Sequence, residues 1–247
     1  MKRSLVYGIH AVEALIKRNC EQVDEICVYG ESRNRRLKGL IAECQRVGLS
    51  IRRVERSHLD TLSGEERHQD VVALLNSTAA EKLPLEQWLD SLNIPPFVLI
   101  LDGVEDPHNL GAALRSADAA GVQAVIIPND RSAQLTGVVR RVASGAAEAL
   151  PLYRVKNLVR TIKLLKQRGI WVIGAAEEGE ESLYSVDLEG PLAVVLGSEG
   201  RGLRRLTREQ CDRLINIPMA GSVSSLNVSV AAGIILYEAV RQRNHLE

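Results

Sequence analysis

The chain has 247 residues, and its 31 lysines and arginines balance its 31 aspartates and glutamates, so the formal net charge is zero. A generally basic protein is therefore excluded, and any binding of nucleic acid must come from local basic patches. Aromatic residues make up 3% of the sequence, too few for the base-stacking platforms of RRM or OB domains. The length suits one large domain or two modest ones, each with its own core.

The cysteines and the N-terminal residues predict a cytoplasmic protein. No two cysteines form a CxxC pair and no histidine stands at zinc-ligand spacing, so we expect reduced thiols and no metal site. The first residues, "MKRSLVYGIHAVEALIKRN", lack the apolar core of a signal peptide. Charged residues also interrupt every apolar run before it reaches the length of a membrane span. The cysteines are Cys20, Cys27, Cys44 and Cys211.

Residues 1–75 are predicted to form a small α/β domain. Three short β-rich runs, "VDEICVYG", "LSIRRVE" and "DVVALLN", are separated by helical patterns near residues 9–19 and 35–47. Residues 76–94 are polar apart from one short amphipathic piece, and prolines stand within and directly after them. This composition predicts a linker, followed by a larger domain over residues 95–247.

Strands and helices alternate in the larger domain. Continuous apolar runs, typical of buried parallel strands, alternate with helical patterns. We therefore predict an α/β fold with a mostly parallel sheet, whose ligands bind beyond the carboxyl ends of the strands. The predicted strands cover residues 97–102, 124–128, 170–175, 192–197 and 214–218, and the predicted helices lie near residues 109–120, 136–147, 157–168 and 225–242.

The last predicted helix carries two apolar rows rather than one. Such a wide apolar surface predicts a helix that is either central or part of a subunit interface. One row contains Leu226, Val230, Ile234 and Tyr237, and the other contains Val228, Ala232 and Ile235.

The loop after residues 97–102 leads into a helix. Asp106 followed by Pro107 is a helix-start signal, which places Asn109 in or just before the first turn. Arg115 then interrupts a surface of small alanines. Taken alone, this segment is a capped helix with a solvated arginine, and His108 is an ordinary loop histidine rather than a catalytic base.

The loop after residues 192–197 is rich in glycine, which lets the backbone turn sharply and approach a ligand closely. Neither a Walker loop nor a GxGxxG fingerprint occurs, which counts against a nicotinamide dehydrogenase. Glu199 in this turn is either simply exposed, or it accepts hydrogen bonds from a ligand or orients a basic partner. The following arginines are either a solvated face or phosphate ligands; they are Arg201, Arg204, Arg205 and Arg208.

The loop after residues 214–218 lies in the uncharged stretch "IPMAGSVSSLNVSVAAGI", residues 217–234. Ser224 or Ser225 is expected to cap the following helix, with Asn227 in its first turn. A serine-capped buried helix would explain Ser225 but not the uncharged length of the run. Small residues let a flat ligand lie against the main chain, so the three loops together favour a pocket for a largely neutral, nucleoside-like ligand.

Three segments, in this order, resemble the motifs of the SPOUT superfamily of S-adenosylmethionine-dependent RNA methyltransferases, in the branch that methylates ribose 2′-hydroxyls. They are "NLGAALRSADAAG", "VVLGSEGRGL" and "IPMAGSVSSLNVSVAAGI". The N-terminal segments "YGIHAVEALI", "EICVYG" and "HLDTLSGEERHQDVVA" are similar to the RNA-binding domain of bacterial 23S rRNA guanosine 2′-O-methyltransferases, which resembles ribosomal proteins that bind kinked RNA. The family usually has glycine after His-Gln, where this chain has Asp70, and this puts the turn geometry there in question.

The resemblance implies methyl transfer from S-adenosylmethionine to the ribose 2′-hydroxyl of a guanosine in 23S rRNA, free or within an assembling large ribosomal subunit. It also implies a homodimer with the C-terminal helix in its interface, and a deep trefoil knot, which the strand pattern alone would not give because threaded chains are very rare. The implied cofactor contacts, mainly through backbone, are Gly197, Ile217, Met219 and Leu226. The implied catalytic residues are Asn109, Arg115, Glu199, Ser225 and Asn227.

The implied mechanism has no imidazole base, because no histidine occupies the motifs of the implied site. Arginine normally stays protonated, with a pKa above about 12, so we expect Arg115 to clamp the target phosphate and polarise the hydroxyl. A role for Arg115 as the base is the second choice. Asn109 and Glu199 would orient Arg115, and Ser225 and Asn227 would hold the ribose. Parts of one active site, with Arg115 as a candidate, would then come from the partner subunit.

Two other functions stay open at this point. One is methylation of tRNA ribose instead of rRNA, and the other is a non-catalytic RNA-binding protein with a degenerate methyltransferase domain. The N-terminal domain favours rRNA by resemblance, and the intact set of implied catalytic residues counts against a degenerate domain. Basic residues of the N-terminal domain either contact RNA or form a solvated face; they are Arg33, Arg35, Arg36, Lys38, Arg52 and Arg53.

Overall fold

The computed structural model describes residues 5–64, 68–76 and 83–244. The chain separates into two compact units, one formed by Met1–Lys82 with Ser144–Ala149 and the other by Leu83–Ala143 with Leu150–Glu247. Part of the predicted linker, residues 77–82, lies outside the described residues. None of the helices in the described ranges combines the length and the apolar character that crossing a bilayer requires.

The first unit is a four-stranded sheet with helices on both faces. Its strands are β1 (Leu5–Tyr7), β2 (Val23–Tyr29), β3 (Ile51–Val54) and β4 (Val71–Leu75), in the order β1-β4-β2-β3, with only β2 and β3 parallel. Because side chains alternate along a strand, β2 and β4 bury residues on both faces. One face packs against α1 (Ile9–Asn19) and α2 (Arg35–Arg46), and the other packs against α3 (Arg56–Ser63).

The predicted elements of this unit are present, and the structure adds β1 and α3, which were not predicted. β1 has only three residues, too few to show a period of two. In α3 only Leu59 is fully buried among eight residues, so no helical stripe stands out in the sequence. A short 3-10 turn, Cys20–Gln22, connects α1 to β2.

The second unit contains a seven-stranded, entirely parallel sheet with the strand order β7-β6-β5-β10-β8-β11-β9. The predicted α/β class and parallel sheet are therefore confirmed. β5 and β10 coincide with the predicted ranges, and β7 and β9 were not predicted, because these edge strands are only partly buried and short. The strands are β5 (Phe97–Asp102), β6 (Ala124–Pro128), β7 (Leu152–Val155), β8 (Trp171–Ala175), β9 (Glu181–Ser182), β10 (Leu192–Gly197) and β11 (Arg213–Asn216).

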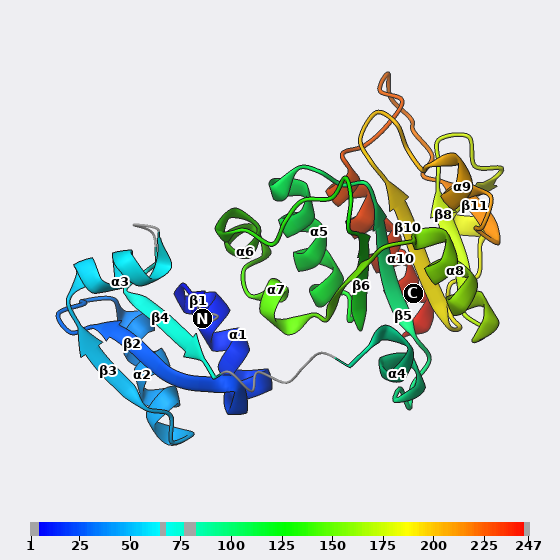
Figure 1. Ribbon diagram of the computed structural model, residues 1–247. Helices are drawn as coiled ribbons and strands as arrows, with labels where there is room; N and C mark the ends of the chain where they lie inside the picture. The colour runs from blue at the N-terminus through cyan, green and yellow to red at the C-terminus, as the bar shows by residue number, and fades with distance from the viewer. Residues whose placement is uncertain (1–4, 65–67, 77–82, 245–247) are drawn as a thin grey trace. The chain divides into compact units, whose positions relative to one another are not determined.

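Helices cover both faces of this sheet (Figure 1). Helices α5 (Pro107–Ala119) and α10 (Val228–Arg243) pack along each other on one face. On the opposite face, α4 (Leu85–Asp90) and α8 (Leu158–Gln167) bury leucines against β5, β6, β8 and β10. Further short helices of this unit are α6 (Gly137–Ala143), the 3-10 turn Leu183–Ser185 and α9 (Arg205–Arg208). α7 (Ala146–Ala149) belongs to the first unit, where it packs against α1.

The single helix predicted near residues 136–147 is wrong. Two short helices, α6 and α7, replace it, and Ser144 and Gly145 interrupt the helical conformation between them. Both residues have positive φ, 52° and 98°, which an α-helix cannot contain. Gly145 is a recognisable breaker, whereas Ser144 gives no local signal of a left-handed backbone.

The strand order reverses beside β5, and this reversal positions the functional loops. From β5 the chain adds β6 and β7 on one side, and it later places β10 on the other side. Gly197 at the end of β10 pairs with Asp102 at the end of β5, so the loops that follow these two strands leave the sheet side by side. In open α/β sheets, this topological switch point is where ligands bind.

Candidate functional site

A cavity of about 880 Å³ lies at the carboxyl edge of the parallel sheet. It is enclosed by the loops after β8, β10 and β11 and by the first turn of α10. All four residues predicted to contact a cofactor line it, namely Gly197, Ile217, Met219 and Leu226. Its size and its mixture of apolar and polar walls suit a ligand of nucleoside class.

A tight glycine hairpin forms one wall of this cavity. Ser198 and Gly202 exchange two backbone hydrogen bonds of 3.1 and 2.9 Å, and Gly200 and Gly202 have φ values of 74° and 62°. A Cβ atom on Gly197 would lie 2.0 Å from the carbonyl carbon of Gly202. Only glycine at position 197 lets the returning loop lie against the end of β10.

Asn227 joins the three loops through its side chain. Its Nδ2 donates to Asn109 Oδ1 at 2.9 Å and to Glu199 Oε1 at 2.5 Å. Its Oδ1 accepts from the backbone N–H and the hydroxyl of Ser229, at 2.9 and 2.6 Å. A carboxylate can only accept, so the contact with Glu199 fixes which side of the amide carries the nitrogen. We call Asn109, Glu199 and Asn227 the amide junction.

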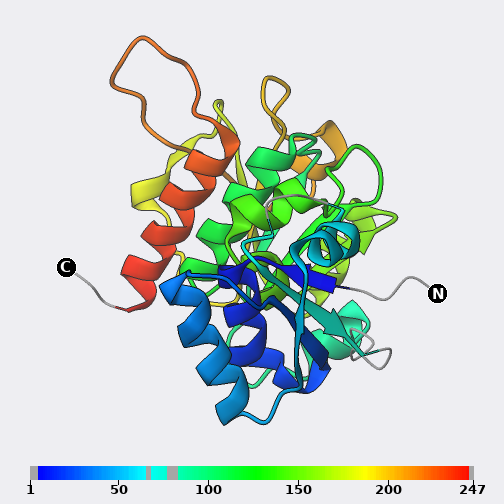
Figure 2. The same ribbon diagram turned by 90° about the vertical axis from the view of Figure 1, so that its left-hand side faces the viewer.

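The helix cap predicted at Ser224 or Ser225 is wrong, because Asn227 is the N-cap of α10. The asparagine accepts from the N–H two residues further on, which any of these polar residues could do. Its second role, donation to the other two loops, decides the position of the helix start. Residues 220–225 are exposed in this chain rather than part of its core (Figure 2). Ser225 lies in this exposed segment and lines the large cavity.

A smaller cavity, about 250 Å³, adjoins the large one. Asn109, 8% exposed, lines the small cavity, and Glu199 lines both. The amide junction thus stands where a cofactor-sized chamber meets a small polar one. This arrangement can hold two reactants side by side and orient polar groups between them, which is what a group transfer requires.

Arg115 lies outside the amide junction in the single chain. It is exposed on α5, lines neither cavity, and within the described residues its side chain makes no hydrogen bond or ion pair. Arg115 stands six residues after Asn109, which turns it by about 240° around the helix axis. The two side chains therefore leave different faces of α5.

Sequence reasoning missed part of the large cavity. The end of β8 and the loop after it, residues 175–178, line it, as does Asn216 at the end of β11. Glu178 in this loop forms an ion pair with Arg208, which closes one side of the cavity. Ligands lie beyond the carboxyl ends of parallel strands, and the loop after the predicted strand at residues 170–175 also follows such an end. The same rule therefore predicts that this loop lines the site.

Cys44 and Cys211 offer no reactive thiolate to the site. Burial raises the pKa of Cys44 to about 11 and that of Cys211 to about 12, so both stay protonated at neutral pH. Across the described ranges, no three His, Cys, Asp or Glu side chains are grouped as a metal site would need.

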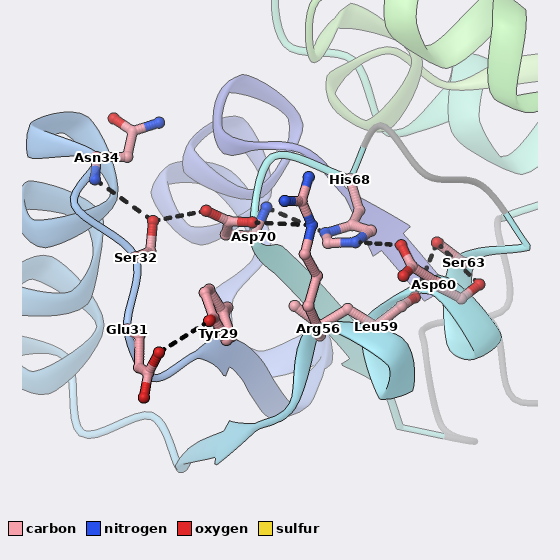
Figure 3. Close-up of polar contacts among 10 residues, drawn as sticks. All are labelled: Tyr29, Glu31, Ser32, Asn34, Arg56, Leu59, Asp60, Ser63, His68 and Asp70. Carbon is pink, nitrogen blue, oxygen red and sulfur yellow. Dashed lines mark hydrogen bonds and ion pairs between the residues drawn. The ribbon is translucent and has the colours of Figure 1, made fainter.

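In the first unit, Asp70 occupies the turn in question (Figure 3). Gln69 and Asp70 have φ values of 54° and 64°, the left-handed region that favours glycine. Asp70 tolerates this region well for a non-glycine residue, and its Oδ2 accepts from the Ser32 hydroxyl at 2.6 Å. The Asp70 N–H donates to Nδ1 of the buried His68, so we assign the His68 proton to Nε2, which donates to Asp60 at 2.8 Å. The glycine-type turn is kept with aspartate in place.

The six basic residues singled out in the first unit are all exposed. Arg52 forms an ion pair with Glu25 at 3.0 Å, and the Arg36 guanidinium lies 3.3 Å from the His10 ring. The surface can therefore offer several cations to an anionic partner.

Comparison with known families matches both units. The model of the SpoU rRNA Methylase family matches residues 96–237, and the model described as RNA 2′-O ribose methyltransferase substrate binding matches residues 5–79. The chain is 53% identical over 240 residues to the 23S rRNA (guanosine-2′-O-)-methyltransferase RlmB of Pectobacterium atrosepticum, covering 97% of this chain and 98% of the relative. It is 52% identical to RlmB of Escherichia coli over 241 residues, covering 97% and 99%.

Solved structures of similar architecture include the SpoU methyltransferase AviRb from Streptomyces viridochromogenes in complex with the cofactor AdoMet. The TM-score is 0.78 at 26% identity, covering 99% of this chain and 92% of AviRb. A structure described as an RNA 2′-O ribose methyltransferase gives a TM-score of 0.78 at 28% identity, covering 98% and 90%.

Proposed function

Because this chain belongs to the SpoU rRNA methylase family, we propose that it transfers the methyl group of S-adenosylmethionine to the 2′-hydroxyl of a guanosine in 23S rRNA. The observation that carries the proposal is the amide junction, which stands between a cofactor-sized cavity and a small polar cavity. RNA is the partner of the N-terminal unit, which matches a substrate-binding model. Relatives of about 52% identity are named for 23S rRNA, which favours rRNA over tRNA.

The large cavity fits S-adenosylmethionine. Its wall over residues 215–219 is uncharged and offers main-chain polar groups, and the close return of the hairpin on Gly197 leaves room for no side chain there. When bound, the cofactor supplies an electrophilic methyl group and a neutral leaving group. Gly197, Ile217, Met219 and Leu226 hold it mainly through backbone, in the large cavity that they line.

The chain's own residues position the nucleophile. Glu199 and Asn109, linked by Asn227, orient the groups that bind the target nucleotide, and Ser225 and Asn227 hold its ribose. Arg115 clamps the target phosphate and polarises the hydroxyl, because a guanidinium stays charged and binds phosphate through a planar fork. The protein aligns the reactants, and alignment contributes much of the rate enhancement.

A second copy of the chain completes the site. Val230 and Tyr237 on α10 are 49% and 52% exposed, and with Ile234 they form an apolar row on a helix whose other row is buried. An exposed apolar row of this kind suits a homodimer interface. The partner subunit then supplies Arg115, which in one chain lies away from the amide junction.

The remaining features of the proposal follow the resemblance. Residues 1–75 form the RNA-binding domain and residues 95–247 form the catalytic domain with its deep trefoil knot. Residues 76–94 connect them, and the part from Leu83 on, with α4, packs with the second unit. The enzyme acts in the cytoplasm on free 23S rRNA or on an assembling large subunit.

Transfer of labelled methyl to unmodified 23S rRNA tests the proposal, with bulk tRNA alongside and Asn227→Ala as the impaired control. Label in the 23S rRNA alone, strongly reduced in the variant, is the expected result. Label in tRNA alone would contradict the assignment of rRNA as the substrate. Absence of cofactor binding would contradict the proposed methyltransferase activity.

Mixed dimers test the shared active site. Arg115→Ala and Asn227→Ala should each be strongly impaired alone, whereas an equal mixture should regain about a quarter of wild-type activity, since half of the dimers then hold one intact site. An inactive mixture, with subunit exchange verified, would place Arg115 and Asn227 in the site of the same chain.

A further inference from the structure

We propose that a third, basic cavity near the amide junction binds a phosphate group of the substrate RNA strand next to the target nucleotide. This inference rests on the proposed function and adds to it a phosphate subsite separate from the Arg115 clamp. The cavity has a volume of about 340 Å³, and we call it the basic cavity. It is lined by Gly103, Glu105, Arg131, Ser198, Arg201, Gly202, Leu203, Arg204 and Arg205.

The lining is strongly cationic in a chain whose net charge is zero. Four arginines and one carboxylate, that of Glu105, face the cavity. A local excess of arginine at a concave surface raises the concentration of anions there. Guanidinium groups also match the geometry of phosphate oxygens.

Two of the four arginines are fixed by acidic partners. The carboxylate of Asp102 is fully buried at the end of β5, and it accepts the Arg204 backbone N–H at 3.2 Å and faces the Arg204 Nε at 3.3 Å. Arg205 pairs with Glu209 at 2.6 Å. The other two, Arg131 and Arg201, are exposed, and among the described residues their side chains have no hydrogen bond or ion pair. Their charges are therefore available to a ligand.

The backbone around Arg131 is held in a costly conformation. Arg131 has a φ of 55°, in the left-handed region that a long side chain rarely adopts. The loop is fixed by two contacts of Ala133, whose N–H donates to Val104 O at 2.9 Å and whose carbonyl accepts from Arg154 at 2.5 Å. Strain that the surrounding structure maintains is typical of ligand-binding positions.

The basic cavity is continuous with the catalytic region. It shares Gly103, Glu105, Ser198 and Arg201 with the small cavity that Asn109 and Glu199 line. When the target ribose of an RNA strand lies at the amide junction, a flanking phosphate of that RNA therefore lies beside the basic cavity. The occupant that fits the charge and the position is a phosphodiester group.

The test measures binding of unmodified 23S rRNA to Arg131→Gln and Arg201→Gln as a function of salt concentration. Each lost phosphate contact should lower the slope of log K against log salt by about 0.7 to 0.9, and should raise the Kd roughly five- to eightfold at about 0.1 M salt. Affinity for S-adenosylmethionine should stay unchanged in Arg131→Gln, because Arg131 lines neither the large nor the small cavity. Arg201 also lines the large cavity, so this readout applies to Arg131→Gln alone. Glu105→Gln should act in the opposite direction and lower the Kd for rRNA.

Arg168→Gln is the matched control, because it also removes one positive charge from the second unit. Arg168 follows α8 at the edge where the parallel strands begin, and it pairs with Asp90 at 3.1 Å. Its variant should keep the wild-type salt slope. If the control loses as much slope as Arg131→Gln and Arg201→Gln, the effect reports net charge and the inference fails.

Unchanged rRNA binding in both cavity variants would also overturn the inference, as would loss of cofactor binding in Arg131→Gln. If Arg131→Gln does not fold, Arg201→Gln decides, because it changes a residue of the exposed hairpin. Failure of the proposed function looks different: the wild-type protein would then bind rRNA without methylating it, and the cavity variants would still weaken that binding.

Discussion

Replacing Asn227 by aspartate should remove the amide junction while keeping the cap of α10. The Oδ1 contacts with Ser229, at 2.9 and 2.6 Å, need only an acceptor, which aspartate retains. The Nδ2 contacts with Asn109 and Glu199, at 2.9 and 2.5 Å, need a donor, which aspartate lacks. The variant also places a carboxylate against the Glu199 carboxylate.

The two effects differ in size and in assay. Aspartate is as good an N-cap as asparagine, so the contribution of the cap to the free energy of unfolding should be kept in Asn227→Asp and should fall by about 1 kcal/mol in Asn227→Ala, while the contact with Glu199 is lost in both variants. A hydrogen bond to a charged group contributes about 1.5–3 kcal/mol, so losing the contact with Glu199 should lower kcat/KM roughly 10- to 150-fold in both variants.

Urea unfolding and methyl transfer to unmodified 23S rRNA measure these quantities. The reasoning would be refuted by an Asn227→Asp enzyme that stays within about twofold of wild-type kcat/KM while Asn227→Ala loses activity. That result would mean that the helix cap, and not the donor to Glu199, matters for turnover.

Three further outcomes are expected. Arg115→Lys should lower turnover at least about tenfold with cofactor binding intact, because lysine cannot form the bidentate contact; near-full turnover would contradict the clamp. Gly197→Ala should abolish cofactor binding, since its Cβ would overlap the hairpin, whereas Gly221→Ala, which meets nothing within 4 Å, should bind normally in a calorimetric titration. In urea unfolding, Ser32→Ala should cost about 1 kcal/mol, but Asp70→Gly less, because relief of left-handed strain offsets the lost hydrogen bond; equal losses would argue against strain.

The strands of the larger domain that were predicted with their observed bounds are those whose burial is almost complete. β5 and β10 lie in the middle of the sheet, and their continuous apolar runs coincide with the predicted ranges. β7 and β9 lie at the two edges, where partial exposure removes the apolar run that marks a central strand. A continuous apolar run indicates burial directly, and it indicates a strand only because central strands are buried.

The geometry of the site depends on residues that are distant in the sequence. Serine and asparagine cap helices equally well, so nothing local favours Asn227 over Ser225 as the start of α10. The choice is made by Glu199 and Asn109, which lie 28 and 118 residues away in the chain. Arg115 illustrates the converse, because its place in a motif gives no information about which face of α5 it occupies in the folded chain.

The arginine run after the glycine hairpin divides between its two interpretations. Arg204, Arg205 and Arg208 each have an acidic partner, so they brace the loops rather than form a free basic face. Only one of these partners, Glu209, is near in the sequence, and the others are contributed by the end of β5 and by the loop after β8. Arg201 is left unpaired within the described residues, and Arg131, far from the run, joins it at the basic cavity. A run of like charges therefore predicts a phosphate site only after the fold has shown which of its members already have a counter-ion.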